Sequence, residues 1–240
     1  MTSSPLALIT GSAKRLGRIA STHLATKGYR LALHYNLSNN EVLLLQEELL
    51  ENGCDCEVFQ ADLKDPNEAR LLLQNVEIKM GSVDLLINNA SFFESPLSTD
   101  FPLSGDWENN RSLHLDAPLI LIEYLANNSQ NALVINMLDT RIAQNKNEYF
   151  SYTLSKKALE NLTYMGASAL APKIRVVGIA PGILLQPEGK EWDAMKEKID
   201  NTPLSRAPTL DHFRSTLDYL IHTSCITGQI IYLNGGEHLN

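Results

Sequence analysis

Tyr152 and Lys156 stand four positions apart in the run Tyr152-Thr-Leu-Ser-Lys156-Lys-Ala-Leu. The run predicts a helix, on which residues four apart share one face, so the phenol and the ammonium lie about one turn apart. A nearby cation favours the phenolate over the phenol, whose reference pKa is about 10. The pair therefore suits proton donation to a substrate, although the same spacing is common in ordinary amphipathic helices.

A glycine-containing loop near the start of the sequence indicates a binding site for a dinucleotide. The apolar run Leu6–Thr10 is followed by Gly11-Ser-Ala-Lys-Arg15-Leu-Gly17, which predicts a buried strand that turns into a helix. Backbone N–H groups at such a helix N-terminus can bind a pyrophosphate. The spacing Thr-Gly-x5-Gly lacks the middle glycine of the better-known fingerprint, and Arg15 stands in its place.

Composition excludes several classes of protein. The 240 residues are 44% hydrophobic, which allows a single domain with a sizeable core. A net charge of −8 argues against a broad nucleic-acid or anionic-membrane surface. We find no apolar run of membrane-spanning length and no signal-peptide pattern, so we expect a cytoplasmic protein. The three cysteines predict neither a disulfide framework nor a zinc site, and no metal is expected.

Apolar runs and helical stretches alternate along the whole sequence. The runs expected to form buried parallel strands are Leu6–Thr10, Arg30–Tyr35, Cys56–Gln60, Val83–Asn88, Ala132–Asn136, Ile174–Ala180 and Gln229–Leu233. The helical stretches between them include Glu41–Leu50, Pro66–Met80, Asp106–Asn127 and Tyr149–Leu170. This alternation predicts an α/β fold, a Rossmann-type doubly wound parallel sheet of seven strands in one domain.

Within that domain we expect two functional halves. Residues 1–130 form the cofactor half and residues 131–240 the catalytic and substrate half. The segment 183–208 contains several prolines and predicts a mobile, loop-rich cover over the site.

Taken together, the Thr10-Gly11 loop and the Tyr-x3-Lys pair resemble the short-chain dehydrogenase/reductase family over essentially the whole chain. The sequence Asn88-Asn-Ala90 matches the family's Asn-Asn-Ala-Gly signature. Pro181-Gly182 fits its loop beside the nicotinamide, and Asn234-Gly-Gly resembles its C-terminal Asp-Gly-Gly. The resemblance implies that Asp62 meets the adenine amine.

The cofactor expected from these residues is NADPH. In this fold a carboxylate after the second strand binds the ribose hydroxyls of NAD, whereas a 2′-phosphate needs that acid absent and a cation present. There is no Asp or Glu between Ser12 and Asn40, and Lys14 lies inside the glycine loop. Lys14 is otherwise a solvated loop lysine. The cofactor residues expected here are Gly11, Lys14, Arg15, Leu16, Gly17, His34, Tyr35, Asn36, Ser38, Asp62, Asn89, Ala90, Ser91, Lys156, Pro181 and Gly182.

The substrate side departs from the usual family pattern. Asp139 stands thirteen positions before Tyr152, where most members carry a serine that donates to a substrate carbonyl. A carboxylate cannot donate a hydrogen bond, so it suits a substrate or phenol that presents N–H or O–H groups better than a ketone oxygen, or else it is only a turn residue or helix cap. Arg15 replaces the middle glycine and Ser91 the last glycine of Asn-Asn-Ala-Gly, and Phe93 follows.

These joint departures resemble the pteridine reductase branch. The resemblance implies that Arg15 reaches the pyrophosphate and the pterin carbonyl, and that Ser91 touches cofactor phosphate and substrate. It also implies that Phe93 stacks on the pterin, and that Asp139 orients Tyr152 and relays its proton. By the same resemblance Lys156 binds the nicotinamide ribose and lowers the pKa of the phenol. A flat ring rich in donors and acceptors suits an aromatic platform with a carboxylate and an arginine at its edges.

Two positions depart from this branch or from the wider family. His114 falls where the family has a catalytic asparagine, and it is either a proton conduit with a reference pKa near 6.5 or a hydrogen-bonded core histidine. Leu37 stands where the pteridine reductases carry an arginine, so the preference for NADP is expected to be shallower.

The resulting hypothesis is an NADPH-dependent pteridine reductase that converts a dihydropterin, such as dihydrobiopterin, dihydromonapterin or dihydrofolate, to the tetrahydro form. The alternatives are a carbonyl or 3-oxoacyl-thioester reductase of the same family, and a catalytically silent NADPH-binding regulatory protein. The family resemblance also implies a homotetramer formed through the helices Asp106–Asn127 and Tyr149–Leu170.

Overall fold

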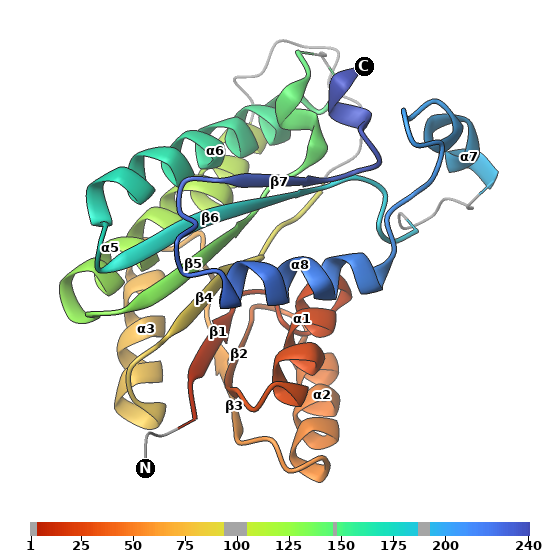
Figure 1. Ribbon diagram of the computed structural model, residues 1–240. Helices are drawn as coiled ribbons and strands as arrows, with labels where there is room; N and C mark the ends of the chain where they lie inside the picture. The colour runs from red at the N-terminus through yellow and green to blue at the C-terminus, as the bar shows by residue number, and fades with distance from the viewer. Residues whose placement is uncertain (1–3, 94–104, 146–147, 187–192) are drawn as a thin grey trace.

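The computed structural model describes residues 4–93, 105–145, 148–186 and 193–240. Within these ranges one seven-stranded sheet has the order β3-β2-β1-β4-β5-β6-β7, and every neighbouring pair is parallel (Figure 1). The strands are β1 (Leu6–Ile9), β2 (Arg30–Tyr35), β3 (Cys56–Gln60), β4 (Leu85–Asn88), β5 (Ala132–Met137), β6 (Ile174–Pro181) and β7 (Ile230–Leu233).

Helices cover both faces of this sheet (Figure 1). One face packs against α1 (Arg15–Thr26), α2 (Asn39–Glu51) and α8 (Leu210–His222), and the other against α3 (Pro66–Met80), α5 (Ala117–Asn128) and α6 (Phe150–Leu170). Shorter elements are α4 (Gly105–Arg111), the π-helical turn η1 (Ser112–Asp116), the 3₁₀ turns η2 (Thr140–Ala143) and η3 (Glu237–Leu239), and α7 (Asp193–Asp200).

The strands are continuous apolar runs because both of their faces are buried. Along β1, Ala7 and Ile9 belong to the core beneath α1, α2 and α8, whereas Leu6 and Leu8 belong to the core beneath α3, α5 and α6. Successive side chains of a strand point to opposite faces, so a strand between two helical layers is apolar at every position. This explains why strand positions were readable from the sequence.

The order of the strands places a topological switch point at the carboxyl ends of β1 and β4. β1 pairs with β2 on one side and with β4 on the other, so the chain reverses its direction of progress across the sheet at β1. Ligands of doubly wound sheets bind at such a switch point. Gly11 follows β1 and Asn89 follows β4, so the fold brings both expected cofactor segments to this switch point.

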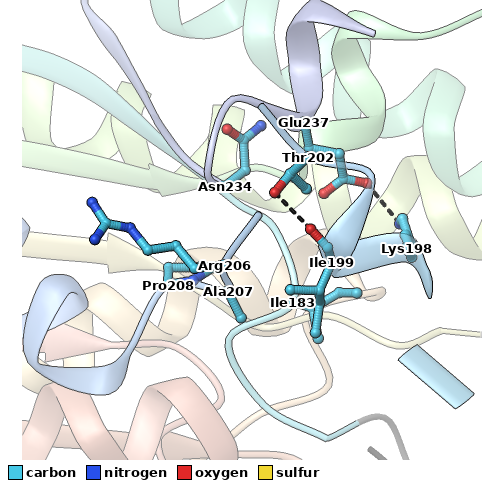
Figure 2. Close-up of a pocket in the computed structure, with 9 residues that line it drawn as sticks. All are labelled: Ile183, Lys198, Ile199, Thr202, Arg206, Ala207, Pro208, Asn234 and Glu237. Atoms are coloured by element: carbon cyan, nitrogen blue, oxygen red, sulfur yellow. Dashed lines mark hydrogen bonds and ion pairs between the residues drawn. The ribbon is translucent and has the colours of Figure 1, made fainter. Parts of the chain in front are cut away.

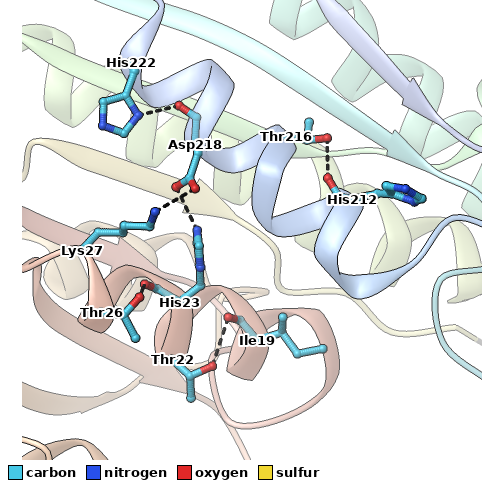
Figure 3. Close-up of polar contacts among 9 residues, drawn as sticks. All are labelled: Ile19, Thr22, His23, Thr26, Lys27, His212, Thr216, Asp218 and His222. Carbon is cyan, nitrogen blue, oxygen red and sulfur yellow. Dashed lines mark hydrogen bonds and ion pairs between the residues drawn. The ribbon is translucent and has the colours of Figure 1, made fainter.

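A polar cluster joins α8 to α1 at the surface (Figure 3). The Asp218 carboxylate of α8 contacts His23 Nε2 at 2.8 Å and Lys27 Nζ at 2.9 Å, both from α1. These groups are partly exposed, so the contacts orient the helices more than they stabilise them. The buried Phe213 and Leu217 of α8 supply the apolar packing beneath.

The predicted fold is confirmed, and most boundaries agree within two residues. Two features differ from the expected pattern. α8 was not among the expected helices, and the expected helix Asp106–Asn127 is interrupted by the π-helical turn η1. Residues 187–192 of the expected cover lie outside the described ranges. In the described part of the chain, no helix has the length and apolar character needed to cross a membrane.

Candidate active site

The glycine loop is held to β4 by the side chain of Asn89. Its amide nitrogen donates to the carbonyl oxygens of Thr10 and Gly11 at 2.9 and 3.1 Å. A Cβ atom added to Gly17 would lie 2.1 Å from the Gly11 oxygen, so only glycine fits where α1 crosses the loop. The N-terminus of α1 is thereby brought to the end of β1, where its N–H groups can receive a pyrophosphate.

Arg15 occupies a left-handed backbone conformation with φ of 50°. Such a conformation is strained for a residue with a Cβ and is normally taken by glycine. The local geometry therefore agrees with the interpretation that Arg15 stands in place of the middle glycine of the fingerprint. Its guanidinium donates to the Gln186 carbonyl oxygen at 3.3 Å, so the side chain extends towards the cover segment.

His34 holds the glycine loop from the side of β2. The Gly11 N–H donates to His34 Nδ1 at 3.0 Å, so Nε2 carries the ring proton and donates to the Ala61 oxygen at 3.1 Å. Burial lowers the pKa of His34 to about 4, against the smaller raising effects of the Ala61 carbonyl and Asp62. Both ring nitrogens are thus used within the protein, and His34 positions the loop.

Lys14 forms an ion pair with Glu41, which the sequence analysis did not consider. Lys14 Nζ lies 2.7 Å from Glu41 Oε1, and both side chains are about half exposed. Glu41 lies one position beyond the acid-free stretch that ends at Asn40, in the first turn of α2. Leu37 beside this turn is exposed, and its apolar side chain has neither the charge nor the donors to bind a phosphate.

The other residues expected at the adenosine end lie around the same edge of the sheet. Tyr35 ends β2, Asn36 follows it, and Ser38 precedes the first turn of α2. Asp62 follows β3, and its carboxylate accepts the Lys64 N–H at 3.1 Å.

The phenol of Tyr152 donates to the Asp139 carboxylate at 3.0 Å. Asp139 also accepts the Arg141 N–H at 2.8 Å, which caps η2. The two interpretations of Asp139, as a helix cap and as a partner of the phenol, therefore both hold. Burial raises the pKa of the Asp139 carboxyl, against lowering contributions from Arg141, Tyr152 and Lys156.

The pKa of the Tyr152 phenol is raised well above 10, first by burial and then by Asp139. The expectation that Lys156 lowers it is wrong for this structure. The Lys156 ammonium donates to the Met137 carbonyl oxygen at 2.8 Å and lies 5.8 Å from the centre of the Tyr152 ring. Burial lowers the pKa of Lys156 to about 8, although Asp139 raises it in part. Tyr152 is therefore a neutral, protonated donor.

His114 is buried in the π-helical turn η1 and bridges two serines. Its Nε2 lies 2.8 Å from Ser91 Oγ, and its Nδ1 lies 2.9 Å from Ser155 Oγ. Burial and the neighbouring charge of Lys156 lower the pKa of His114 well below 6.5. His114 is thus a neutral, hydrogen-bonded histidine, which is the second of the two interpretations of this residue.

Aromatic side chains lie beside the Tyr152 phenol. The exposed ring of Phe93 lies 4.4 Å from the ring of Tyr149 and 4.8 Å, edge to face, from that of Tyr152. The Arg141 guanidinium lies 4.5 Å from the centre of the Tyr149 ring. Sequence reasoning did not identify Tyr149 or Arg141. The position of Arg141 two residues after Asp139 was the available signal.

The C-terminal segment supports the turn that carries Asp139. The Asn234 amide nitrogen donates to Thr140 Oγ1 at 2.5 Å, and Asn234 Oδ1 accepts the Gly236 N–H at 3.0 Å. Gly182, after β6, lies close against Asn234, since an added Cβ would be 2.9 Å from the Asn234 Cβ. Pro181 ends β6 beside it.

A small pocket lies next to this segment and does not include the phenol or Phe93 (Figure 2). In Figure 2 the buried carboxylate of Glu237 points to Lys198 of α7, and its Oε1 lies 2.7 Å from Lys198 Nζ. This contact ties the expected cover to the C-terminus. The lining residues are Ile183, Lys198, Ile199, Thr202, Arg206, Ala207, Pro208, Asn234 and Glu237.

The sequence model that describes short chain dehydrogenases matches residues 5–197. This protein belongs to the short-chain dehydrogenase family. Among curated relatives, a 3-oxoacyl-[acyl-carrier-protein] reductase of Staphylococcus aureus is 27% identical, covering 97% of this chain and 98% of the relative. The dihydromonapterin reductase of Klebsiella pneumoniae is 26% identical, covering 97% and 96%.

Solved structures also resemble this chain. FolM alternative dihydrofolate reductase 1 from Brucella canis, complexed with NADP, is 36% identical with a TM-score of 0.90, covering 100% of this chain and 96% of that one. The corresponding protein of Brucella suis, also in complex with NADP, is 36% identical with a TM-score of 0.89.

Proposed function

We propose that this protein is an NADPH-dependent reductase that converts a dihydropterin to its tetrahydro form. The observation that carries this proposal is the hydrogen bond from Tyr152 to Asp139, beside the exposed ring of Phe93. A ketone reductase of this family needs a second donor at position 139, which a carboxylate is not. An N–H-rich flat ring meets an acceptor and an aromatic face in this site.

NADPH is supported as the cofactor by the geometry of the loop after β1. Gly11 and Gly17 allow the loop to pack closely against α1 and the segment after β4, and Arg15 and Lys14 bring positive charge to the loop. The likeness to two dihydrofolate reductases in complex with NADP supports the phosphate-bearing form. By the family pattern, Leu16, Tyr35, Asn36, Ser38, Asp62, Asn89, Ala90, Ser91, Pro181 and Gly182 complete the cofactor site around the loop.

NADPH supplies the hydride that reduces a ring carbon of the pterin. Tyr152 holds the proton for the adjacent ring nitrogen, since its high pKa keeps the phenol neutral until substrate arrives. Asp139 orients the phenol, Lys156 holds the nicotinamide ribose, and Phe93 stacks on the pterin. Arg15 and Ser91 contact both cofactor and substrate in this arrangement.

The first alternative is a carbonyl or 3-oxoacyl-thioester reductase, to which the Staphylococcus relatives at 27% identity correspond. Asp139 in place of serine argues against it. The second alternative, a silent NADPH-binding regulator, is disfavoured because Tyr152 and Lys156 are both present, with Lys156 buried and Tyr152 half-buried beside Asp139.

One assay separates the three functional hypotheses. Consumption of NADPH is followed with dihydrobiopterin, dihydromonapterin and dihydrofolate, and in parallel with an activated ketone and an acetoacetyl thioester. Turnover of the dihydropterins with little or none of the carbonyls is the expected result. Turnover of the carbonyls alone would establish the first alternative, and NADPH binding without turnover of any substrate would establish the second.

We further propose a homotetramer that acts in the cytoplasm. The exposed apolar side chains Leu119 of α5 and Leu154 and Met165 of α6 support an interface over these helices. The three free cysteines are consistent with a reducing compartment. Light scattering should give four times the mass of one chain, and a single-chain mass would refute the tetramer.

The cover around α7 is proposed to close on bound substrate.

A further inference from the structure

The hydrogen bonds around His114 determine which of its nitrogens carries the proton. Ser155 Oγ donates its single proton to the Tyr152 carbonyl oxygen at 2.7 Å, because a carbonyl can only accept. Ser155 Oγ must therefore accept at its contact with His114 Nδ1, 2.9 Å away. His114 Nδ1 carries the ring proton.

The other ring nitrogen then orients Ser91. In the neutral imidazole Nε2 has only a lone pair, so Ser91 Oγ, 2.8 Å away, donates its proton to it. Neutrality follows from the burial of His114 and the nearby charge of Lys156, which lower its pKa. Because a hydroxyl has one proton, Ser91 is left with oxygen lone pairs for all its other neighbours.

Those neighbours are the Tyr152 phenol and the open site. Ser91 is an exposed residue, and its hydroxyl is close enough to the Tyr152 phenol to act on the pKa of that phenol. If Ser91 donated its proton to the phenol oxygen, it would favour the phenolate. His114 Nε2 is a second possible acceptor for the same proton. We assign it to His114, since this buried lone pair has no other donor among the described residues, whereas the phenol is already bonded to Asp139.

We propose that His114 is a positioning residue that fixes the Ser91 hydroxyl as an acceptor towards the site. Ser91 and Asp139 then flank the Tyr152 phenol with two acceptors and select substrates that present N–H donors. This deepens the proposed pterin reductase function and rests on it for the choice of substrate. The orientation of Ser91 itself rests only on the contacts of His114.

The first test reads the tautomer directly. In ¹⁵N-histidine-labelled protein, the signals of His114 are assigned by their loss in His114→Gln. We expect a protonated Nδ1 and an unprotonated Nε2, and Ser91→Ala should shift the Nε2 signal while leaving Nδ1 protonated. A protonated Nε2 would overturn the proposal. This measurement needs no substrate, so it is independent of the proposed function.

The second test uses two matched variants. In His114→Gln the terminal amide oxygen reaches about as far as Nε2 and can accept from Ser91, whereas in His114→Asn the shorter amide stays near Ser155. We expect kcat/KM for dihydrobiopterin to fall about tenfold in His114→Asn and less than about threefold in His114→Gln, as one hydrogen bond lost or kept requires. The reverse order would show that only the Ser155 contact matters.

A double-mutant cycle separates orientation from packing. If His114 acts through Ser91, His114→Asn should add no further loss in a Ser91→Ala background. If the losses of kcat/KM in the two single variants multiply in the double variant, the proposal is overturned. It is also overturned if lower melting temperatures of the variants account for their losses of activity. If the parent enzyme consumes no NADPH with any dihydropterin, the proposed function fails, while the ¹⁵N spectrum still decides the orientation of Ser91.

Discussion

The Tyr152 phenol donates to the Asp139 carboxylate over 3.0 Å, and burial with that charge keeps the phenol protonated. Asp139 opposes ionisation of the phenol, whereas the hydrogen bond from the phenol favours the ionised carboxylate, whose pKa is raised by burial. A protonated phenol held next to a carboxylate can donate one proton to a bound substrate.

Tyr152→Phe tests this role. The variant should lower kcat for the preferred dihydropterin by about 10²–10⁴, because a positioned proton donor is lost, while NADPH affinity stays nearly unchanged. Stopped-flow turnover and NADPH fluorescence titration measure the two quantities. Near-normal turnover would refute the role, unless the assayed step takes its proton from water.

Lys156 predicts a basic limit to activity. With a pKa of about 8, the ammonium is protonated below that pH and loses its charge above it, so kcat/KM should fall about tenfold per pH unit on the alkaline side. Lys156→Arg keeps the positive charge across this pH range. The alkaline fall in kcat/KM should therefore disappear in this variant, whatever its absolute rate. A parent profile that stays flat to pH 9.5 would contradict the prediction.

The ion pair between Lys14 and Glu41 predicts opposite effects of two substitutions. Lys14→Ala should weaken NADPH far more than NADH, since only the former loses a charge-assisted contact of roughly 1.5–3 kcal/mol. Glu41→Gln releases Lys14 and should strengthen NADPH relative to NADH. Dissociation constants for both cofactors in the three proteins check this. Equal losses for NADPH and NADH in Lys14→Ala would assign Lys14 to the loop.

Phe93 and Asp139 distinguish a pterin site from a carbonyl site. Phe93→Ala should weaken dihydrobiopterin by roughly 1–3 kcal/mol, by analogy with base stacking on aromatic side chains, and barely affect an activated ketone. Asp139→Ser introduces a donor and should shift the ratio of kcat/KM values towards the ketone. If the parent reduces only the ketone and Phe93→Ala changes neither substrate, the pterin assignment is wrong.

His34 predicts a loss of stability in acid. Its pKa of about 4 lies below the value near 6.5 of an unfolded histidine, so between these pH values the unfolded chain binds the extra proton. The free energy of unfolding should therefore fall as pH drops from 6.5 towards 4, by up to about 1.4 kcal/mol per pH unit from this group. Urea titrations of the parent and of His34→Gln measure it. Identical pH slopes in the two proteins would count against His34.

The sequence by itself determined the element order and the residue types at the site. Strands buried on both faces are apolar throughout, and the spacing of Tyr152 and Lys156 follows from one helical turn, so both are local patterns. Asp139 and Phe93 were readable as departures from a family pattern for the same reason. α8 was overlooked although Thr209 begins it with a capping box, because His212 stands where glutamate or glutamine is usual.

Only the tertiary structure decided how these residues act on one another. The direction of the Lys156 ammonium, the raised pKa of Tyr152 and the pairing of Lys14 with Glu41 depend on burial and on contacts between different segments. The connection from Ser155 through His114 to Ser91 spans three segments of the chain. Such effects follow from desolvation and from hydrogen-bond geometry across the fold, neither of which is encoded in local spacing.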